Sequence, residues 1–212
     1  MTAAREKALT SIALHCAVPF HFVTNHNLNS WIHADFPLHP GFKYLSAVHQ
    51  CDYLRCYMLH VYGGGYTDIK PTTHNWNRFF DLHALTRKLG AGYTEVAPHG
   101  VARVGGDLEQ DMKANYQKLI GVCSLIMSPR SIFTRAWFQA VNTLLDKNLA
   151  RLAQHPARHP QDHFGVQFEG QGPSQYPLPW TGIGGDLFHP LAYRFADQFL
   201  HLDMAPSFEN YR

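Results

Sequence analysis

The chain has 212 residues, of which 45% are hydrophobic, 16% are charged and 13% are aromatic, and its formal net charge is +2. This length and apolar content suffice for one hydrophobic core, so we expect a single domain over residues 1–212. The small charge and the lack of a basic run or stripe argue against nucleic acid as a partner. The aromatic content is typical of an enzyme with an aromatic-lined cleft, and equally of a protein that docks on a membrane or partner.

The cysteines and the hydropathy pattern bear on the cellular compartment. The four cysteines, Cys16, Cys51, Cys56 and Cys123, form no CxxC pair, which favours a reducing compartment. No apolar run reaches the length of a transmembrane helix, and the N-terminus has no signal-peptide pattern. We therefore expect a cytoplasmic protein, with peripheral association with the inner membrane face as an alternative.

Hydrophobic periodicity and turn residues predict helices and strands that alternate along the chain. Helices are expected over residues 3–15, 27–33, 43–62, 75–90 and 131–152. Strands are expected over residues 18–24, 65–69, 95–97 and 120–127. Loops are expected over residues 99–111 and 153–178, which are rich in glycine, proline or polar residues. This alternation predicts an α/β fold.

Two adjacent apolar stripes run along the expected helix over residues 43–62. The second stripe is interrupted only by Asp52 and Arg55, which are three residues apart and therefore neighbours on one face. A charge pair in such a place is costly unless partners or a ligand satisfy it. The pair is therefore either a structural ion pair or part of a binding site.

Three glycines at positions 63–65 follow this helix, and a short alternating strand then places Tyr66, Asp68 and Lys70 on one face. Glycine can end a helix in the left-handed conformation and permits close backbone approach. An aspartate at a strand end beside a glycine turn is suited to bind a phosphate-bound metal or a sugar hydroxyl. Taken alone, Asp68 could also be a turn former, and Tyr66 could simply pack.

The pattern D-x-x-R followed by G-G-x-Y-x-D resembles the signature of the DxD glycosyltransferases. This sugar-binding-region family (glycosyltransferase family 32-like) includes yeast initiating mannosyltransferases, capsular polysaccharide transferases and clostridial glucosylating toxins. The resemblance implies a GT-A-like, Rossmann-like α/β domain with a mostly parallel central sheet. The strand expected over residues 18–24 resembles the family's second strand, so the usual first strand is either missing or the chain is a truncated or compact version.

The resemblance also implies a reaction and a set of residue roles. The reaction is transfer of a hexose from a nucleotide diphosphate sugar to a hydroxyl of a glycan or lipid-linked acceptor, with retention of the anomeric configuration. Donor binding falls on the residues that match the signature, with Lys70 as a further phosphate contact, and catalysis is assigned to Asp68, Arg55 and Lys70. The donor-binding set is Asp52, Arg55, Tyr66, Gly64 and Gly65, together with Trp180.

The resemblance further implies a divalent metal cofactor, Mn²⁺ or Mg²⁺, on Asp68 with His189 as a second ligand. Lys70, however, stands where the family has its second aspartate. An ammonium group cannot bind a cation, but it could contact the diphosphate as a fixed charge. The sequence is therefore compatible with a metal on Asp68 and with a metal-free site in which Lys70 contacts the diphosphate.

Several alternatives remain. Trp180 could fill the core rather than close over the donor, and His189 could stabilise a turn before Pro190. The whole chain could be a catalytically degenerate domain that binds a sugar nucleotide or glycan without turnover. The fifteen histidines also allow a metal-binding scaffold.

Overall fold

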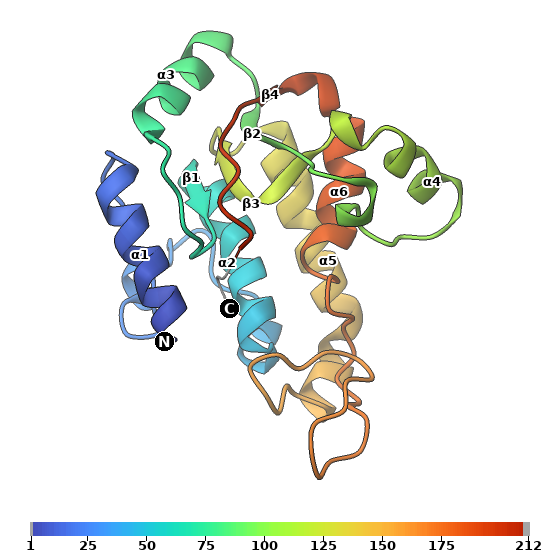
Figure 1. Cartoon of the computed structure of the whole chain (residues 1–212). Helices are drawn as coiled ribbons and strands as arrows, with labels where there is room; N and C mark the ends of the chain where they lie inside the picture. The colour runs from blue at the N-terminus through green and yellow to red at the C-terminus, as the bar shows by residue number, and fades with distance from the viewer. Residues whose placement is uncertain (1, 210–212) are drawn as a thin grey trace.

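The computed structural model describes residues 2–209 and has an α/β fold, with helices packed around one four-stranded sheet (Figure 1). The α-helices are α1 (Ala3–His15), α2 (Ala47–Val61), α3 (Trp76–Thr86), α4 (Gly106–Ala114), α5 (Ile132–Gln154) and α6 (Gly185–Arg194). The strands are β1 (Gly64–Thr67), β2 (Gly90–Thr94), β3 (Ile120–Met127) and β4 (Phe199–His201). Short 3₁₀ helices span Leu28–Trp31, Pro40–Tyr44, Pro98–Gly100, Tyr116–Lys118 and Ala196–Gln198.

The sheet is mixed, with strand order β1-β3-β2-β4. The long strand β3 runs antiparallel to both of its neighbours, and only β2 and β4 are parallel. The expectation of a mostly parallel sheet is therefore wrong for the described residues. Alternation of helices and strands along the chain predicts the fold class, but it leaves open the direction in which each strand enters the sheet.

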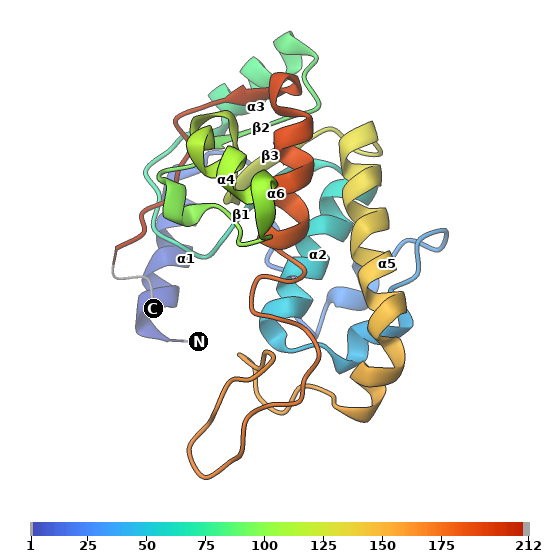
Figure 2. The same cartoon turned by 90° about the vertical axis from the view of Figure 1, so that its right-hand side faces the viewer.

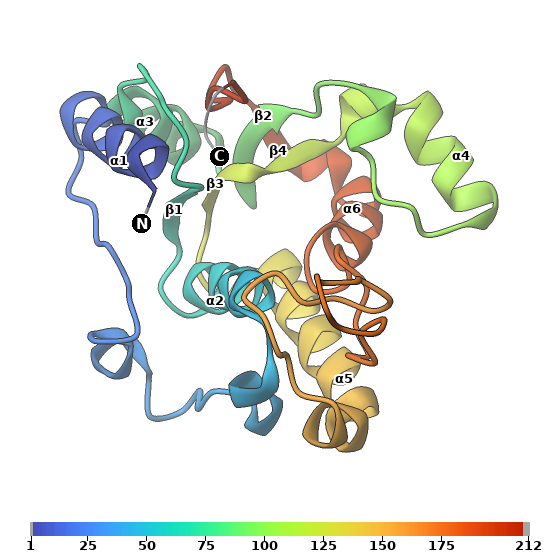
Figure 3. The ribbon, with the colours of Figure 1, turned by 60° about the horizontal axis from the view of Figure 1, so that its bottom comes forward.

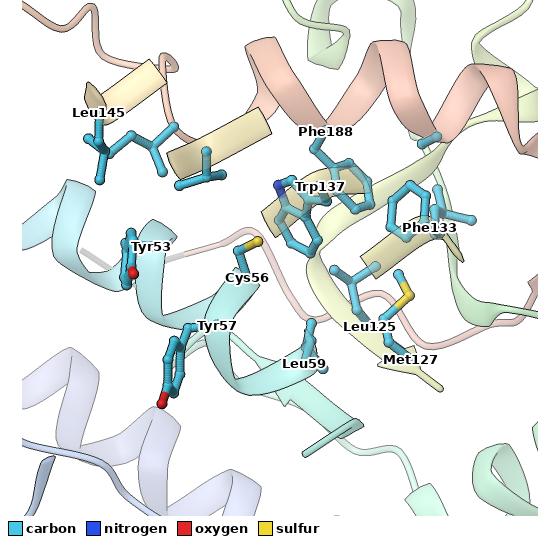
Figure 4. Close-up of a cluster of buried hydrophobic side chains, with 14 of the residues drawn as sticks. Tyr53, Cys56, Tyr57, Leu59, Leu125, Met127, Phe133, Trp137, Leu145 and Phe188 are labelled. Atoms are coloured by element: carbon cyan, nitrogen blue, oxygen red, sulfur yellow. The ribbon is translucent and has the colours of Figure 1, made fainter. Parts of the chain in front are cut away.

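The two faces of the sheet bury separate sets of side chains. On one face Leu125 and Met127 of β3 join a core with α2, α5 and α6, which lie side by side (Figures 2 and 4). On the other face Ile126 packs with Trp76 of α3 and Ile12 of α1. This follows from the alternation of side chains along a strand. The helix α2, which carries the candidate site, is thus fixed between the sheet and α5.

The expected helices over residues 3–15 and 131–152 and the strand over residues 120–127 are confirmed within a few residues. Ser131 caps α5 by accepting a hydrogen bond from the Thr134 amide (3.2 Å), and Ser46 caps α2 by accepting from the His49 amide (3.4 Å). The helix expected over residues 27–33 is only one 3₁₀ turn, and that expected over residues 75–90 ends at Thr86. The strand expected over residues 65–69 begins and ends earlier, at Gly64 and Thr67.

Other expected elements are wrong. Residues 18–24 form no strand, although their apolar residues alternate, and Phe20 and Phe22 are 43% and 41% exposed. Pro19 cannot donate to a ladder, and the chain between α1 and α2 runs over the surface (Figure 3). This segment therefore cannot serve as the second strand of a parallel sheet.

The strand expected over residues 95–97 and the loop expected over residues 99–111 are also corrected. The strand is β2, whose glycines Gly90 and Gly92 allow close packing on Met127 and Ile120 of β3. Such a strand has few side chains and so lacks a hydrophobic pattern. The expected loop contains most of α4. Within the described residues, no helix is long and apolar enough to cross a membrane.

Gly63 ends α2 at φ +67°, where a Cβ atom would lie 2.5 Å from Cδ and 2.8 Å from N of Pro129. Gly64, at φ +83°, has open space around the same position. Both alanine substitutions carry the cost of a left-handed backbone, about 1–2 kcal/mol, and only Gly63→Ala adds a clash, worth about 1–3 kcal/mol. We expect urea unfolding to show a larger stability loss for Gly63→Ala than for Gly64→Ala. Equal losses would contradict this packing.

Candidate functional site

Five side chains of the sequence signature converge between α2 and the end of β1, and we call them the Arg55 cluster. They are Asp52, Arg55, Tyr66, Asp68 and Lys70. Arg55 Nη2 lies 3.2 Å from Asp52 Oδ1 and 3.1 Å from Asp68 Oδ1, and it donates to the Tyr66 hydroxyl (3.1 Å). That hydroxyl donates to Asp68 Oδ1 (2.8 Å), and Lys70 Nζ lies 2.9 Å from Asp68 Oδ2. The cluster therefore contains three ion pairs linked through Arg55 and Asp68, and the Tyr66 hydroxyl bridges these two side chains.

The backbone after β1 holds Asp68 in place. The Asp68 amide donates to Cys123 O of β3 (2.8 Å), so the chain stays paired with β3 beyond the last strand residue. The Lys70 amide donates to Asp68 O (2.7 Å), which closes a tight turn. Arg5 of α1 donates to Ile69 O (2.7 Å) from the other side. This bracing fixes the direction of the Asp68 and Lys70 side chains.

The cations of the cluster are more buried than the carboxylates. The side chains of Arg55 and Lys70 are 8% and 6% exposed, whereas those of Asp52 and Asp68 are 13% and 20% exposed. Burial raises the pKa of Asp52 to about 6, because Arg55 offsets it only in part. Burial also acts on Asp68, but the charges of Arg55 and Lys70 outweigh it and lower the pKa of Asp68. Asp68 is thus a stable anion, while Asp52 exchanges its proton closer to neutral pH.

The pKa of Asp52 gives a pH-dependent prediction. A carboxyl group with a higher pKa in the folded than in the unfolded state binds more protons when folded, so its contribution to stability increases as the pH falls from about 6 towards about 4. Asp52→Asn removes this proton uptake. We expect the stability of the variant relative to the original protein to rise by roughly 2–3 kcal/mol between pH 4 and pH 8. Urea unfolding of both proteins at several pH values measures it, and a constant difference would refute the assignment.

Three further residues meet the cluster that sequence patterns did not single out. Gly184, which precedes α6, lies so close that a Cβ atom there would be 3.3 Å from Asp52 Oδ2. Lys70 Nζ lies 2.9 Å from Cys123 Sγ and 4.7 Å from the centre of the Phe208 ring. These contacts join residues far apart in the chain, so local sequence patterns do not predict them.

Gly64 and Gly65 border the cluster, but local backbone conformation and packing explain why glycine occupies each position. Gly64 adopts a positive φ, which glycine tolerates at no steric cost. At Gly65 a Cβ atom would lie 2.6 Å from the ring of Trp76. Packing and backbone conformation account for both glycines without a ligand.

Trp180 and His189 do not join the cluster. Trp180 is 42% exposed, and its ring lies edge-on to that of His163 with centroids 5.3 Å apart. His189 lies in α6 rather than in a turn. In the described chain neither side chain has a hydrogen bond, ion pair or ring contact with Asp68. The expected pairing of Asp68 with His189 is therefore not found.

His189 is instead buried in a polar contact of its own. Its Nδ1 accepts a hydrogen bond from the Ala102 amide (2.9 Å), and its Nε2 lies 3.5 Å from Glu95 Oε2. Because Nδ1 accepts, the proton of the neutral ring is on Nε2, facing the carboxylate. The histidine thus fastens α6 to residues 95–102.

The residues of the cluster do not fit a divalent metal ion. Asp68 Oδ1 already accepts from Tyr66 and Arg55, and Oδ2 faces the Lys70 ammonium. A cation on either oxygen would lie beside two positive charges. In the part of the chain that the structure describes, no group of three or more His, Cys, Asp or Glu side chains is arranged to hold a metal. The Lys70 ammonium, 2.9 Å from Oδ2, already neutralises the oxygen that a metal on this carboxylate would need.

Comparison of the chain with protein-family models, curated proteins and solved structures finds no match. The geometry of the Arg55 cluster and the residue pattern that predicted it are therefore the basis for a function. The fold defines an α/β protein with a charged cluster at the end of its first strand.

Proposed function

We propose that the Arg55 cluster binds the sugar and diphosphate of a nucleotide diphosphate sugar, and that the protein transfers the hexose to a hydroxyl of a glycan or lipid-linked acceptor. One observation carries this proposal. Asp52, Arg55, Tyr66 and Asp68, four side chains of one glycosyltransferase-like pattern, meet within hydrogen-bond distance at the end of β1. As part of the same proposal, we infer that the α/β fold is related to the GT-A fold.

The chemistry of these groups suits a sugar donor. Carboxylates accept hydrogen bonds from sugar hydroxyls, and the side chains of Asp52 and Asp68 are more exposed than those of Arg55 and Lys70. Arg55 and Lys70 supply positive charge that stabilises the departing diphosphate. In the proposed step the bond from the sugar C1 to the phosphate oxygen breaks, the acceptor oxygen bonds to C1, and the acceptor proton passes to the leaving phosphate. Retention of configuration rests on the resemblance alone.

A second candidate is a domain that binds a sugar nucleotide or glycan without turnover. The observation in its favour is that both oxygens of Asp68 are already engaged by Tyr66, Arg55 and Lys70. A carboxylate held in this way is fixed for recognition, but it has less freedom to respond to charge that develops during a reaction.

A ligand-stabilisation screen with uridine and guanosine diphosphate sugars tests the proposal, because a ligand that binds the folded state raises its stability by mass action. We expect at least one donor to raise the melting temperature equally in Mn²⁺ and in EDTA, since Lys70 replaces the ion. Release of free sugar or transfer from that donor would identify an enzyme, and binding without either would identify the second candidate. The proposal fails if none of these donors raises the melting temperature.

A further inference from the structure

A pocket lies away from the Arg55 cluster, between the end of α2 and the start of α5, which run side by side (Figures 2 and 3). Its volume is about 390 Å³, and its lining residues are Phe36, His60, Arg130, Arg135, Phe138 and Gln139. Arg55 and His60 are five residues apart on α2, which places them about 140° apart around the helix. The proposed sugar site and this pocket therefore lie on different faces of α2.

Aromatic rings form the wall of this pocket. The rings of His60 and Phe138 stack with centroids 5.0 Å apart, and the Phe36 ring meets them edge-on at 5.5 and 6.4 Å. Small-molecule sites are concave and mostly apolar, with volumes of about 300–1,000 Å³. A pocket at the lower end of this range suits a ligand with a single ring.

Two exposed arginines stand at the pocket, and none of its lining residues is acidic. In the described chain neither Arg130 nor Arg135 has an ion pair with a carboxylate. Both flank the N-terminus of α5, whose dipole is positive there, and the first turn of α5 has no acidic residue. Positive charge thus gathers at one place, and no carboxylate of the described residues pairs with it, an arrangement that an anion would stabilise.

His60 adds a polar atom without a partner. It is only 4% exposed and lines the pocket. Its Nδ1 lies 3.3 Å from Thr134 Oγ1, which also lies 3.3 Å from Ser131 O and 3.1 Å from Ser131 Oγ. In the described residues Nε2 has no hydrogen-bond partner. Burial and the charges of Arg135 and Arg130 lower the pKa of His60, an effect that a bound anion would oppose.

We propose that this pocket binds a small aromatic phosphate, whose ring packs on Phe36 and Phe138 and whose phosphate pairs with Arg130 and Arg135. Guanidinium groups bind phosphate through two parallel hydrogen bonds, and two of them match the charge of a phosphate dianion. The aromatic wall accounts for the ring, and the N-terminus of α5 adds favourable charge. The ligand class follows from the pocket alone and does not depend on the proposed sugar-transfer function.

Phenyl phosphate is the probe, and NMR of the histidine ring protons is the readout, because fourteen other histidines serve as internal references. We expect a saturable shift of the His60 resonance and no shift of His189. Inorganic phosphate and phenol, each carrying one half of the probe, should bind at least about tenfold more weakly, since each lacks a set of contacts. Equal binding of either half would overturn the assigned ligand class.

Arg130→Gln combined with Arg135→Gln should weaken phenyl phosphate binding at least about tenfold, since both charge-assisted contacts are lost. Arg151→Gln, an exposed arginine in the last turn of α5, is the matched control and should leave the affinity unchanged. If the double variant fails to fold, Arg135→Gln alone serves the same comparison. Unchanged affinity in the pocket variants, or no saturable shift of His60, overturns the proposal. Tighter binding of a phosphotyrosine peptide than of phenyl phosphate would overturn the assignment of a small molecule as the ligand.

Discussion

Arg55→Gln is expected to lower the free energy of unfolding by about 3–5 kcal/mol, because it removes the one cation that pairs with both carboxylates of the cluster. The side chain is 8% exposed, so water cannot replace the lost charge. Lys70 remains beside Asp68, but Asp52 loses its only ion-pair partner in the described chain. Urea unfolding at pH 7.5, where Asp52 is ionised, gives the largest effect.

A double variant distinguishes the effect of losing the ion pair from the effect of losing the packing of the Arg55 side chain. Adding Asp52→Asn to Arg55→Gln removes a whole pair and leaves the pair of Asp68 and Lys70 intact. We expect this double variant to be more stable than Arg55→Gln alone, because no unpaired buried carboxylate is left. Additive losses would show that Arg55 acts through packing rather than charge.

We expect Asp68→Asn combined with Lys70→Met to abolish donor binding more completely than either substitution alone. Asp68→Asn alone also destabilises the fold, because the buried charges of Arg55 and Lys70 lose the carboxylate between them. The combined change removes one whole pair and keeps that of Asp52 and Arg55. We expect the double variant to fold and to show no rise in melting temperature with a sugar nucleotide that stabilises the original protein.

The pair of Glu109 and Lys113 on α4 provides a matched control, since it is also a carboxylate and a lysine in contact. Glu109→Gln with Lys113→Met should leave the donor-induced rise in melting temperature intact. A full donor response in the Asp68 and Lys70 variant would exclude the cluster as the donor site and would leave its role purely structural.

Local sequence determined the parts of the site that lie within one element. The three-residue spacing of Asp52 and Arg55 places them on one helix face, and the alternation of a strand places Tyr66, Asp68 and Lys70 on another. Because one short glycine turn joins these two elements, their facing side chains had little freedom to separate. The convergence of the cluster was therefore predictable from the sequence, as was the long helix α5.

Only the tertiary structure decided which distant segments reach the cluster. The direction of β3 brings Cys123 to Lys70, and the approach of α6 brings Gly184 to Asp52 while directing His189 towards Glu95. Segment 18–24 alternates as a strand does, yet it forms no strand, and its two phenylalanines stay exposed. Local periodicity describes which face of an element is apolar, whereas pairing depends on how all the elements share one core. For this reason the sequence predicted the members of the cluster, and packing alone fixed its surroundings and the direction of the strands.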